Sequence, residues 1–154
     1  MIKKIRLLLI FILAVSCGYE PMLSKKNESN YNFLLKEILF EGDKTINLKV
    51  KEKLNNYRLK KTGKVFMLKI ISTSSKKILA KNIKGDPTNF KNISSLYVEV
   101  LLEDKIQNIL KFEADFNYNN SANKFDLKNY EKDIKRNLAE TMTSELILKL
   151  SNIQ

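Results

Sequence analysis

The one cysteine of the 154-residue chain stands where a lipid-modification signal requires one. Cys17 directly follows Leu13-Ala14-Val15-Ser16, and apolar residues ending in a small residue before a cysteine are typical of a bacterial lipobox. In that signal the thiol receives a diacylglycerol through a thioether, the peptide bond before the cysteine is cut, and the freed amine can be acylated. Two or three acyl chains anchor firmly, because each buried CH₂ contributes about 0.8 kcal/mol. The sequence predicts lipid attachment at Cys17, with an incidental cysteine after an ordinary signal peptide as the alternative.

The residues before Cys17 have the layout of a secretory signal. A positive start precedes an unbroken apolar run: Lys3, Lys4 and Arg6, then Leu7 to Val15. At about 1.5 Å per helical residue this run reaches only about 14 Å, roughly half of a bilayer core. We therefore expect residues 1–16 to be removed and the mature chain to lie outside the cytoplasm. Gly18 follows the cysteine in place of Asp, the inner-membrane retention residue of some bacteria, which favours lipid anchoring at the periplasmic face of the outer membrane.

The basic charge of the chain raises the question of a nucleic-acid partner. Lys and Arg number 28 against 17 Asp and Glu, and removal of the three basic signal residues leaves 25 against 17, a charge of +8. Nearly all of these residues are lysine, which an AT-rich genome favours, whereas nucleic-acid readers prefer the bidentate guanidinium. Together with the expected destination outside the cytoplasm, this argues against nucleic-acid binding, which would require that Cys17 is not lipidated.

The chain lacks the residues of common catalytic and metal sites. It has no histidine, which excludes Ser-His-Asp and Cys-His catalysis, and its single cysteine excludes a Cys-rich metal site. No Gly-rich phosphate loop occurs. Four carboxylates share the polar face of a predicted hairpin with Lys111: Glu99, Glu103, Glu113 and Asp115. Cross-strand ion pairs on a solvent-exposed face account for their presence without acid–base catalysis. We expect no enzyme, no metal and no cofactor besides the acyl chains on Cys17.

Hydrophobic periodicity predicts four strands. Apolar residues at alternate positions predict a strand at 33–41, and a run of β-branched and apolar residues predicts another at 65–72. Residues Ser95 to Tyr118 alternate as a β-hairpin with one buried and one solvent-exposed face. Six residues of the second hairpin strand share the apolar parity: Ile106, Leu110, Phe112, Ala114, Phe116 and Tyr118. The polar segment 72–77 predicts a break, after which 78–83 either extends the second strand or forms a ragged edge.

Two amphipathic helices complete the pattern. Ile46, Val50 and Leu54 recur at helical spacing after a candidate cap at Thr45, and a longer helix runs from a cap at Asp126 to about Leu150. The order strand, helix, strand, strand, strand, helix predicts an α+β two-layer sandwich, in which two helices cover one face of a four-stranded, mostly antiparallel sheet. We expect residues 17–32 to form a lipidated polar tether and residues 33–154 a single domain.

Lysines gather around the predicted break and the loop that follows it: Lys76, Lys77, Lys81, Lys84 and Lys91. On a lipid-anchored envelope protein, such a cluster favours an anionic partner such as a phosphorylated glycolipid. Solubility and the lysine-rich composition are the alternative explanation.

The start of the mature chain resembles that of the LPS-assembly lipoprotein family, LptE. Cys17-Gly18-Tyr19-Glu20-Pro21-Met22-Leu23 is similar to the Cys-Gly-aromatic-x-Pro-Leu start of α-proteobacterial members, and the predicted element order is similar to the family's fold. Phe116-Asn117-Tyr118-Asn119 resembles the family's Ser-Tyr-Asn stretch before a long, charged C-terminal helix, here Tyr130 to Leu150. Lys, Asn and Ser replace the usual small residues after the start, and the helix is less rich in Ala and Arg.

The resemblance implies a non-catalytic subunit of the lipopolysaccharide translocon. Family members sit in the lumen of the outer-membrane barrel LptD, help it assemble, plug it, and bind lipopolysaccharide on its way to the cell surface. In some members a basic residue after a Phe contacts the glycolipid; Phe90-Lys91 is similar, so Lys91 is a binding candidate, joined by Lys76 and Lys77 from the charge pattern. An auxiliary lipoprotein of an envelope lipid ABC-type transport system is the alternative function.

Overall fold

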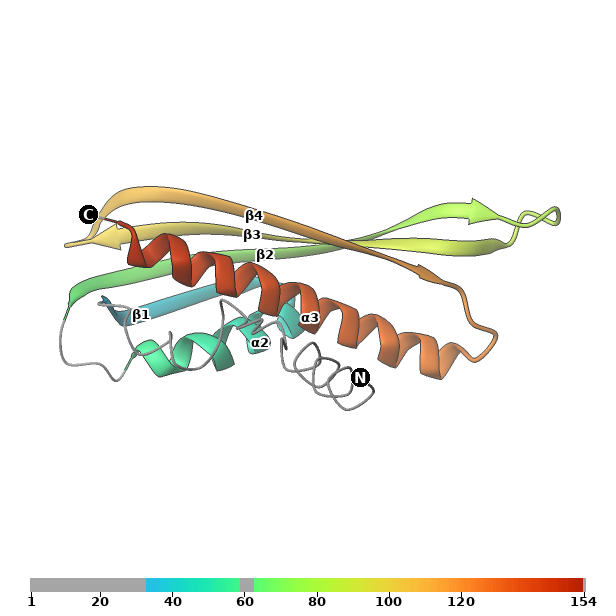
Figure 1. The fold of residues 1–154 in the computed structure, drawn as a ribbon, viewed down its shortest axis with the longest axis horizontal. Coiled ribbons are helices and arrows are strands. Elements are labelled where there is room, and N and C mark those ends of the chain that lie inside the picture. The colour runs from blue at the N-terminus through green and yellow to red at the C-terminus, as the bar shows by residue number, and fades with distance from the viewer. Residues whose placement is uncertain (1–32, 59–62, 154) are drawn as a thin grey trace, which may run out of the picture. The chain divides into compact units, whose positions relative to one another are not determined.

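A computed structural model of the chain describes residues 33–58 and 63–153. The predicted signal, the lipid site Cys17 and the tether lie outside the described residues. The elements follow in the order β1(Phe33–Gly42), α2(Lys44–Leu54), a 3-10 turn η2(Asn55–Tyr57), β2(Lys64–Lys81), β3(Pro87–Leu102), β4(Lys105–Asn119) and α3(Lys124–Ser151) (Figure 1). The predicted α+β class and the predicted order of strands and helices are confirmed.

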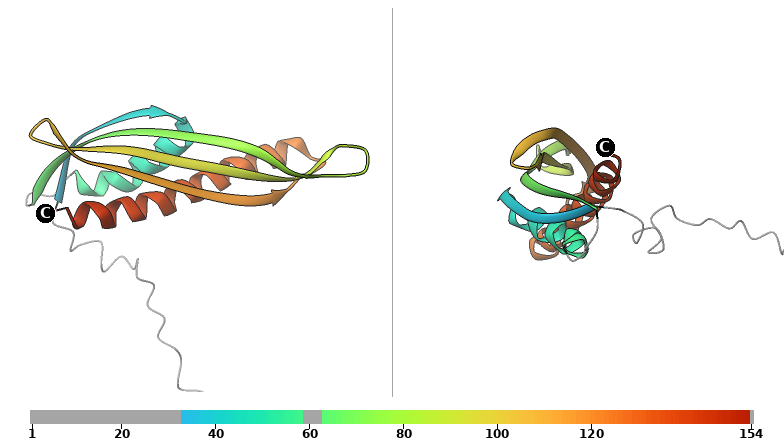
Figure 2. Two further views of the ribbon diagram at one scale, coloured as in Figure 1. Left: turned by 90° about the horizontal axis from the view of Figure 1, so that it is seen from above. Right: turned by 90° about the vertical axis from the view of Figure 1, so that its left-hand side faces the viewer.

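The four strands form one mixed sheet in the order β1-β2-β3-β4. β1 runs parallel to β2, which requires the crossover that α2 supplies, while the pairs β2–β3 and β3–β4 are antiparallel. Both helices cover the same face of the sheet (Figure 2). No helix or strand of the described residues covers the opposite face of the sheet, which we call the open face; an antiparallel meander with one apolar face allows this.

The core lies between the sheet and the two helices. Alternate strand residues point into it, and the helices add apolar residues at three- and four-residue spacing. The largest fully buried side chains are Phe33, Leu35, Ile46, Val50, Leu54, Phe66, Leu68, Ile70, Leu96, Met142, Leu146 and Leu150. Phe33 stacks on Tyr57 with ring centroids 4.9 Å apart, so the start of β1 and the end of the first helical segment are joined through aromatic packing.

Both helix caps lie before the positions that the sequence suggested. Asp43, not Thr45, caps α2 by accepting hydrogen bonds from the amides of Thr45 and Ile46, and Asn123, not Asp126, caps α3. A capping side chain must precede the first turn to reach amides two and three residues ahead. Thr45 and Asp126 already lie inside the first turns, so the sequence placed each helix start two or three residues late.

The predicted break in the second strand was wrong. β2 continues through the polar segment to Lys81, and β3 begins at Pro87. Polar side chains pair across the two strands: the hydroxyls of Thr73 and Ser95 are 2.7 Å apart, and Ser74 donates to Asn92. These cross-strand hydrogen bonds satisfy groups that local hydropathy cannot place in a strand.

This continuation creates a long hairpin, which we call the arm and define as residues 73–95. β1 ends at Gly42, opposite Ser72, so β1 does not flank the arm. β4 flanks it on the other side as far as the pair Asn89 and Asn119. The turn of the arm therefore projects beyond the rest of the sheet, at the right of Figure 1.

Candidate functional site

Strand alternation divides the predicted lysine cluster between the two faces of the sheet. Lys76 shares the parity of the buried β2 residues and lies on the helix side. Its ammonium is 2.5 Å from Glu131 Oε1 of α3 and 3.7 Å from the centre of the Phe90 ring. The Tyr118 hydroxyl donates to the same carboxylate oxygen at 2.7 Å. Lys76 is thus part of an internal network that joins the arm to α3.

This network changes the acidity of its members. Burial raises the pKa of Glu131, but hydrogen bonds from Lys76 and Tyr118 outweigh it and hold that pKa below its ordinary value. Burial and the Glu131 carboxylate both raise the pKa of the Tyr118 hydroxyl well above its ordinary value. At neutral pH the carboxylate is therefore charged and the phenol is neutral, which is the state that this network requires.

Lys77 and Lys91 lie on the open face, directly opposite each other in the β2–β3 register. Like charges in this arrangement repel. Lys91 reaches Asp115 of β4, with 3.0 Å between ammonium and carboxylate, whereas Lys77 makes no hydrogen bond or ion pair within the described residues. The structure therefore brings two of the three predicted binding lysines together and leaves one of them available to a ligand.

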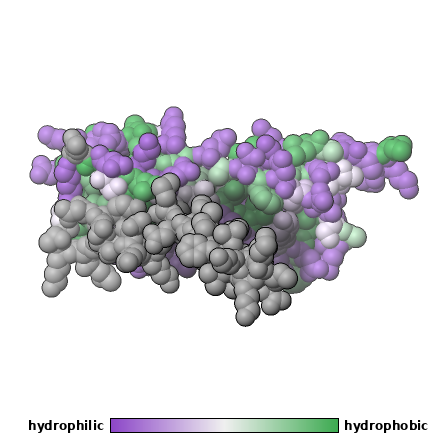
Figure 3. Space-filling view, viewed as in Figure 1, coloured by the Kyte–Doolittle hydropathy of each residue, from purple (hydrophilic) through white to green (hydrophobic). Residues whose placement is uncertain are grey.

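The turn of the arm adds exposed cations and exposed apolar side chains. Lys81 precedes the turn and Lys84 lies in it, while Ile83 at its tip is fully exposed, with Ile78 and Leu79 half exposed. In Figure 3 apolar and hydrophilic side chains lie next to one another at the right-hand end, where the turn of the arm is seen in Figure 1. Cations next to apolar side chains are what an anionic amphiphile requires, since its phosphate and its hydrocarbon need different contacts.

Hydrogen bonds fix the turn that carries Ile83. The Asn82 side chain accepts from the amides of Lys84 and Asp86, each at 2.9 Å, and donates to the Asp86 carboxylate at 3.1 Å. The backbone adds bonds between Asn82 and Asp86 and between Gly85 and Asn82. Ile83 is thus presented to solvent by an ordered turn, a feature that the sequence pattern did not indicate.

The carboxylates considered for acid–base work are spread along the open face. Glu99 lies opposite Lys69, Asp115 binds Lys91, and Glu113 lies opposite Ser95. Glu103 belongs to the β3–β4 turn, where its φ is +48°. No group of three or more metal-ligating side chains occurs in residues 33–58 and 63–153.

The open face is less polar than the sequence predicted. A bulge in the β3–β4 register pairs Val100 with Asn108 but Leu101 with Ile106, which moves Ile106 out of the core-facing set and leaves it 55% exposed. Phe116 keeps the helix-facing parity, since it pairs with Asn92, but it is 45% exposed because β4 is an edge strand. Other large apolar side chains are exposed on the open face itself: Leu39, Val65 and Ile109.

Comparisons with known proteins identify the fold and not a sequence family. No protein-family model matches the chain, and no curated protein sequence matches it. Solved structures do share its architecture. Rare lipoprotein B from Shewanella oneidensis aligns with a TM-score of 0.55 at 15% identity, covering 75% of this chain and 97% of that one.

Two further structures align in the same way. A minor lipoprotein from Acinetobacter baumannii has a TM-score of 0.55 at 14% identity, covering 75% of this chain and 90% of that one. A putative lipoprotein from Caulobacter crescentus has a TM-score of 0.54 at 12% identity, covering 76% and 87%. Within the described part of this chain, no helix is long and apolar enough to cross a membrane.

Proposed function

We propose that the protein is a lipid-anchored outer-membrane lipoprotein of the lipopolysaccharide translocon. In this role it helps the LptD barrel assemble, plugs the barrel and binds lipopolysaccharide during delivery to the cell surface, without catalysis of its own. The observation that carries the proposal is an agreement between independent features. A lipobox ends at Cys17, and the domain that follows has the fold of structures described as lipoproteins.

The arm is the part of the domain that suits a phosphorylated glycolipid. Lys77 offers a cation on the open face beside Lys91, which is paired with Asp115, and Lys81 and Lys84 add charge at the turn. Lysine binds phosphate as a point charge, and the exposed Ile83 supplies an apolar contact for acyl chains. Because the binding is mainly electrostatic, we expect it to weaken as salt concentration rises.

The arm lies far from the point where the lipidated segment joins the domain. Phe33, the first residue of β1, pairs with Lys64 at the start of β2. β2 has 18 residues, and at about 3.3 Å per residue it spans about 60 Å before the turn of the arm. A ligand on the arm would therefore be held well away from the anchored end of the domain.

The open face offers a surface for the barrel wall. Large exposed apolar side chains on one face favour a binding role, and this face exposes Leu39, Val65, Ile106 and Ile109. Charged side chains are interspersed among them, since Lys69 and Glu99 lie between Leu39 and Ile109 in the strand register. The proposal assigns this face to the barrel and the arm to the glycolipid.

Affinity purification of the tagged full-length protein from its host membranes tests the proposal. A large outer-membrane β-barrel should copurify. Recovery of soluble periplasmic proteins alone would reject the proposal, and recovery of ABC transporter subunits would support the alternative of an auxiliary lipoprotein in lipid transport.

A second experiment addresses the ligand. Lys77→Glu should weaken binding to purified lipopolysaccharide by tenfold or more at low salt, and Lys51→Glu, an exposed lysine on α2, serves as the matched control. Equal binding by both variants would remove the arm from the proposed site.

A further inference from the structure

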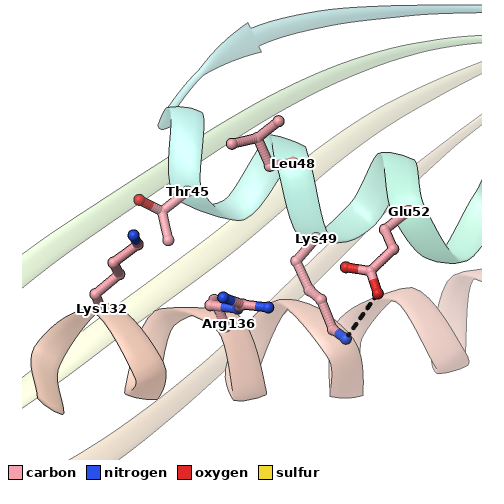
Figure 4. Close-up of a pocket in the computed structure, with 6 residues that line it drawn as sticks. All are labelled: Thr45, Leu48, Lys49, Glu52, Lys132 and Arg136. Atoms are coloured by element: carbon pink, nitrogen blue, oxygen red, sulfur yellow. Dashed lines mark ion pairs between the residues drawn. The ribbon is translucent and has the colours of Figure 1, made fainter. Parts of the chain in front are cut away.

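A second cluster of cations lies between the two helices, on the face of the sheet opposite Lys77 and Lys91. The residues Thr45, Leu48, Lys49 and Glu52 of α2 and Lys132 and Arg136 of α3 line a cavity of about 230 Å³ (Figure 4). We call it the α2–α3 cleft. It holds three cationic side chains against one carboxylate, so its lining carries a net positive charge.

The carboxylates near the cleft already form ion pairs with lysines, one of which, Lys49, lines the cleft. Glu140 accepts Lys49 at 3.3 Å and Lys53 at 3.5 Å, and Asp43 accepts Lys135 at 2.7 Å. Glu52 lies 3.8 Å from Lys49, which is a long distance for an ion pair. The carboxylates around the cleft therefore neutralise Lys49, Lys53 and Lys135 and leave the remaining cations uncompensated.

Lys132 and Arg136 are those remaining cations. Neither makes a hydrogen bond or ion pair with any residue that the structure describes. They stand four residues apart on one helix, where like charges are adjacent and repel. Figure 4 shows the Lys132 ammonium directed toward Thr45 of α2, with Arg136 lying between the helices. An anion bound between them would remove this repulsion.

We infer that the α2–α3 cleft binds a phosphorylated group. The guanidinium of Arg136 presents a fork that matches two phosphate oxygens, and Lys132 adds a point charge. The Thr45 hydroxyl, which makes no hydrogen bond within the described residues, supplies a further donor. Leu48, 69% exposed, offers an apolar contact for the carbon part of the ligand.

The volume of the cleft and the capped start of α2 restrict the chemical class of the ligand. About 230 Å³ accommodates a phosphate with a small organic group and not a whole glycolipid. Asp43 already accepts the amides of Thr45 and Ile46, so the side chains, and not the end of α2, supply the donors. A phosphomonoester in solution and a phospholipid headgroup share this chemistry.

This inference is independent of the proposed function. The cleft is built from α2 and α3, whereas the proposed glycolipid site is on the arm, so Lys77→Glu should leave the cleft unchanged. Loss of lipopolysaccharide binding and loss of phosphate binding would therefore be observed in different variants.

Titration of the full-length protein in detergent with glycerol 3-phosphate, followed by NMR, tests the inference. Amide shifts of α2 and α3 should saturate, and Arg136→Gln should weaken binding by tenfold or more. Arg58→Gln is the matched control, because Arg58 is the other arginine in the described residues and is exposed. Lys132→Gln is a second variant that keeps the test valid if Arg136→Gln fails to fold.

Two lipid samples identify the source of the phosphate. Binding to phosphatidylglycerol nanodiscs that exceeds binding to phosphatidylcholine nanodiscs, and that depends on Arg136, would assign the site to a lipid headgroup. Binding of glycerol 3-phosphate alone would assign it to a soluble phosphomonoester. No binding of either probe by the unaltered protein, or equal binding by Arg136→Gln and Arg58→Gln, would overturn the inference.

Discussion

Lys76 of β2 and Glu131 of α3, 55 residues apart in the sequence, form an ion pair that fastens the arm to the long C-terminal helix. The pair is completed by the Phe90 ring beneath the ammonium and by the Tyr118 hydroxyl on the carboxylate. Lys76, a candidate ligand residue by sequence, thus has an internal partner in the structure. The charge proposed to face the ligand therefore lies on Lys77 and Lys91, on the open face of the sheet.

We predict that Glu131→Gln lowers the free energy of unfolding by about 1–2 kcal/mol, because Lys76 and Tyr118 lose a charged acceptor in a partly buried position. Tyr118→Phe should cost about 1 kcal/mol through the lost hydrogen bond. Urea unfolding followed by circular dichroism measures both. Lys77→Met, on the opposite face, should change stability by less than about 0.5 kcal/mol; an equal loss in all three variants would contradict the assignment.

Stability should fall in acid. Burial raises the pKa values of Asp43, Glu131 and Glu140, but hydrogen bonds and charges of nearby lysines outweigh it, so all three lie below their ordinary values. Carboxyls of this kind bind fewer protons folded than unfolded. Their contribution is fully present above the unfolded pKa, 3.8 for Asp and 4.5 for Glu, and is lost as pH falls through the folded value.

The free energy of unfolding should therefore be nearly constant between about pH 5.5 and 7 and should decline below about pH 4.5. Urea titrations at a series of pH values measure this profile. Glu131→Gln removes one of the three groups and should flatten part of the decline. A profile that rises toward pH 3 would contradict these pKa directions.

Gly42→Ala should destabilise the fold by about 3 kcal/mol or more. Gly42 has a φ of +96°, and a Cβ added there would overlap the carbonyl oxygen of Ser72. Moving the β2 backbone away would break the hydrogen bond that the Ser72 carbonyl accepts from the Asp43 amide at 3.2 Å. It would also disturb the Ser72 hydroxyl, which donates to Asn47 Oδ1 of α2 at 2.7 Å. Thermal unfolding measures the loss.

Gly85→Ala is the matched control for this prediction. Gly85 also has a positive φ, +87°, but a Cβ added there would meet no atom within 4 Å. Only backbone strain applies, so the expected loss is about 1 kcal/mol. If the two variants were equally stable, the close approach of Gly42 to β2 would be unimportant.

Ile83→Asp should reduce binding to lipopolysaccharide and leave the fold intact. The side chain is fully exposed, at 107% of its reference area, so its replacement removes no packing and should change stability by less than about 0.5 kcal/mol. Placing a carboxylate at the tip also repels an anionic ligand. Binding in low salt and thermal unfolding, measured on the same sample, separate these effects; unaltered binding would exclude the tip from the contact.

Cys17→Ser should abolish incorporation of labelled palmitate, because a hydroxyl cannot form the thioether that lipidation requires. The measurement is autoradiography of the protein after growth with the labelled fatty acid. The unaltered chain provides the positive control. Labelling that persists in the variant would refute the lipobox assignment.

Local pattern determined much of this protein. The 2- and 3.6-residue periods predicted each strand and helix, because side chains that share a period share a face and must be buried together. The predicted lipobox at Cys17 likewise lies within a few residues, since lipid modification acts on a linear segment. The predicted caps were two or three residues late, because Thr45 and Asp126 are themselves acceptable capping types.

Tertiary structure decided what local pattern left open. Residues 72–77 are polar, and only pairing with β3 makes them part of a strand, since the hydrogen-bonding partner is some twenty residues away. The bulge that exposes Ile106 depends in the same way on the β3–β4 register. The separation of Lys76 from Lys77, and the meeting of Lys49 with Lys132 and Arg136 in one cleft, follow from how the sheet and helices pack. Sequence determined which residues are basic; the packing determined which of them have partners.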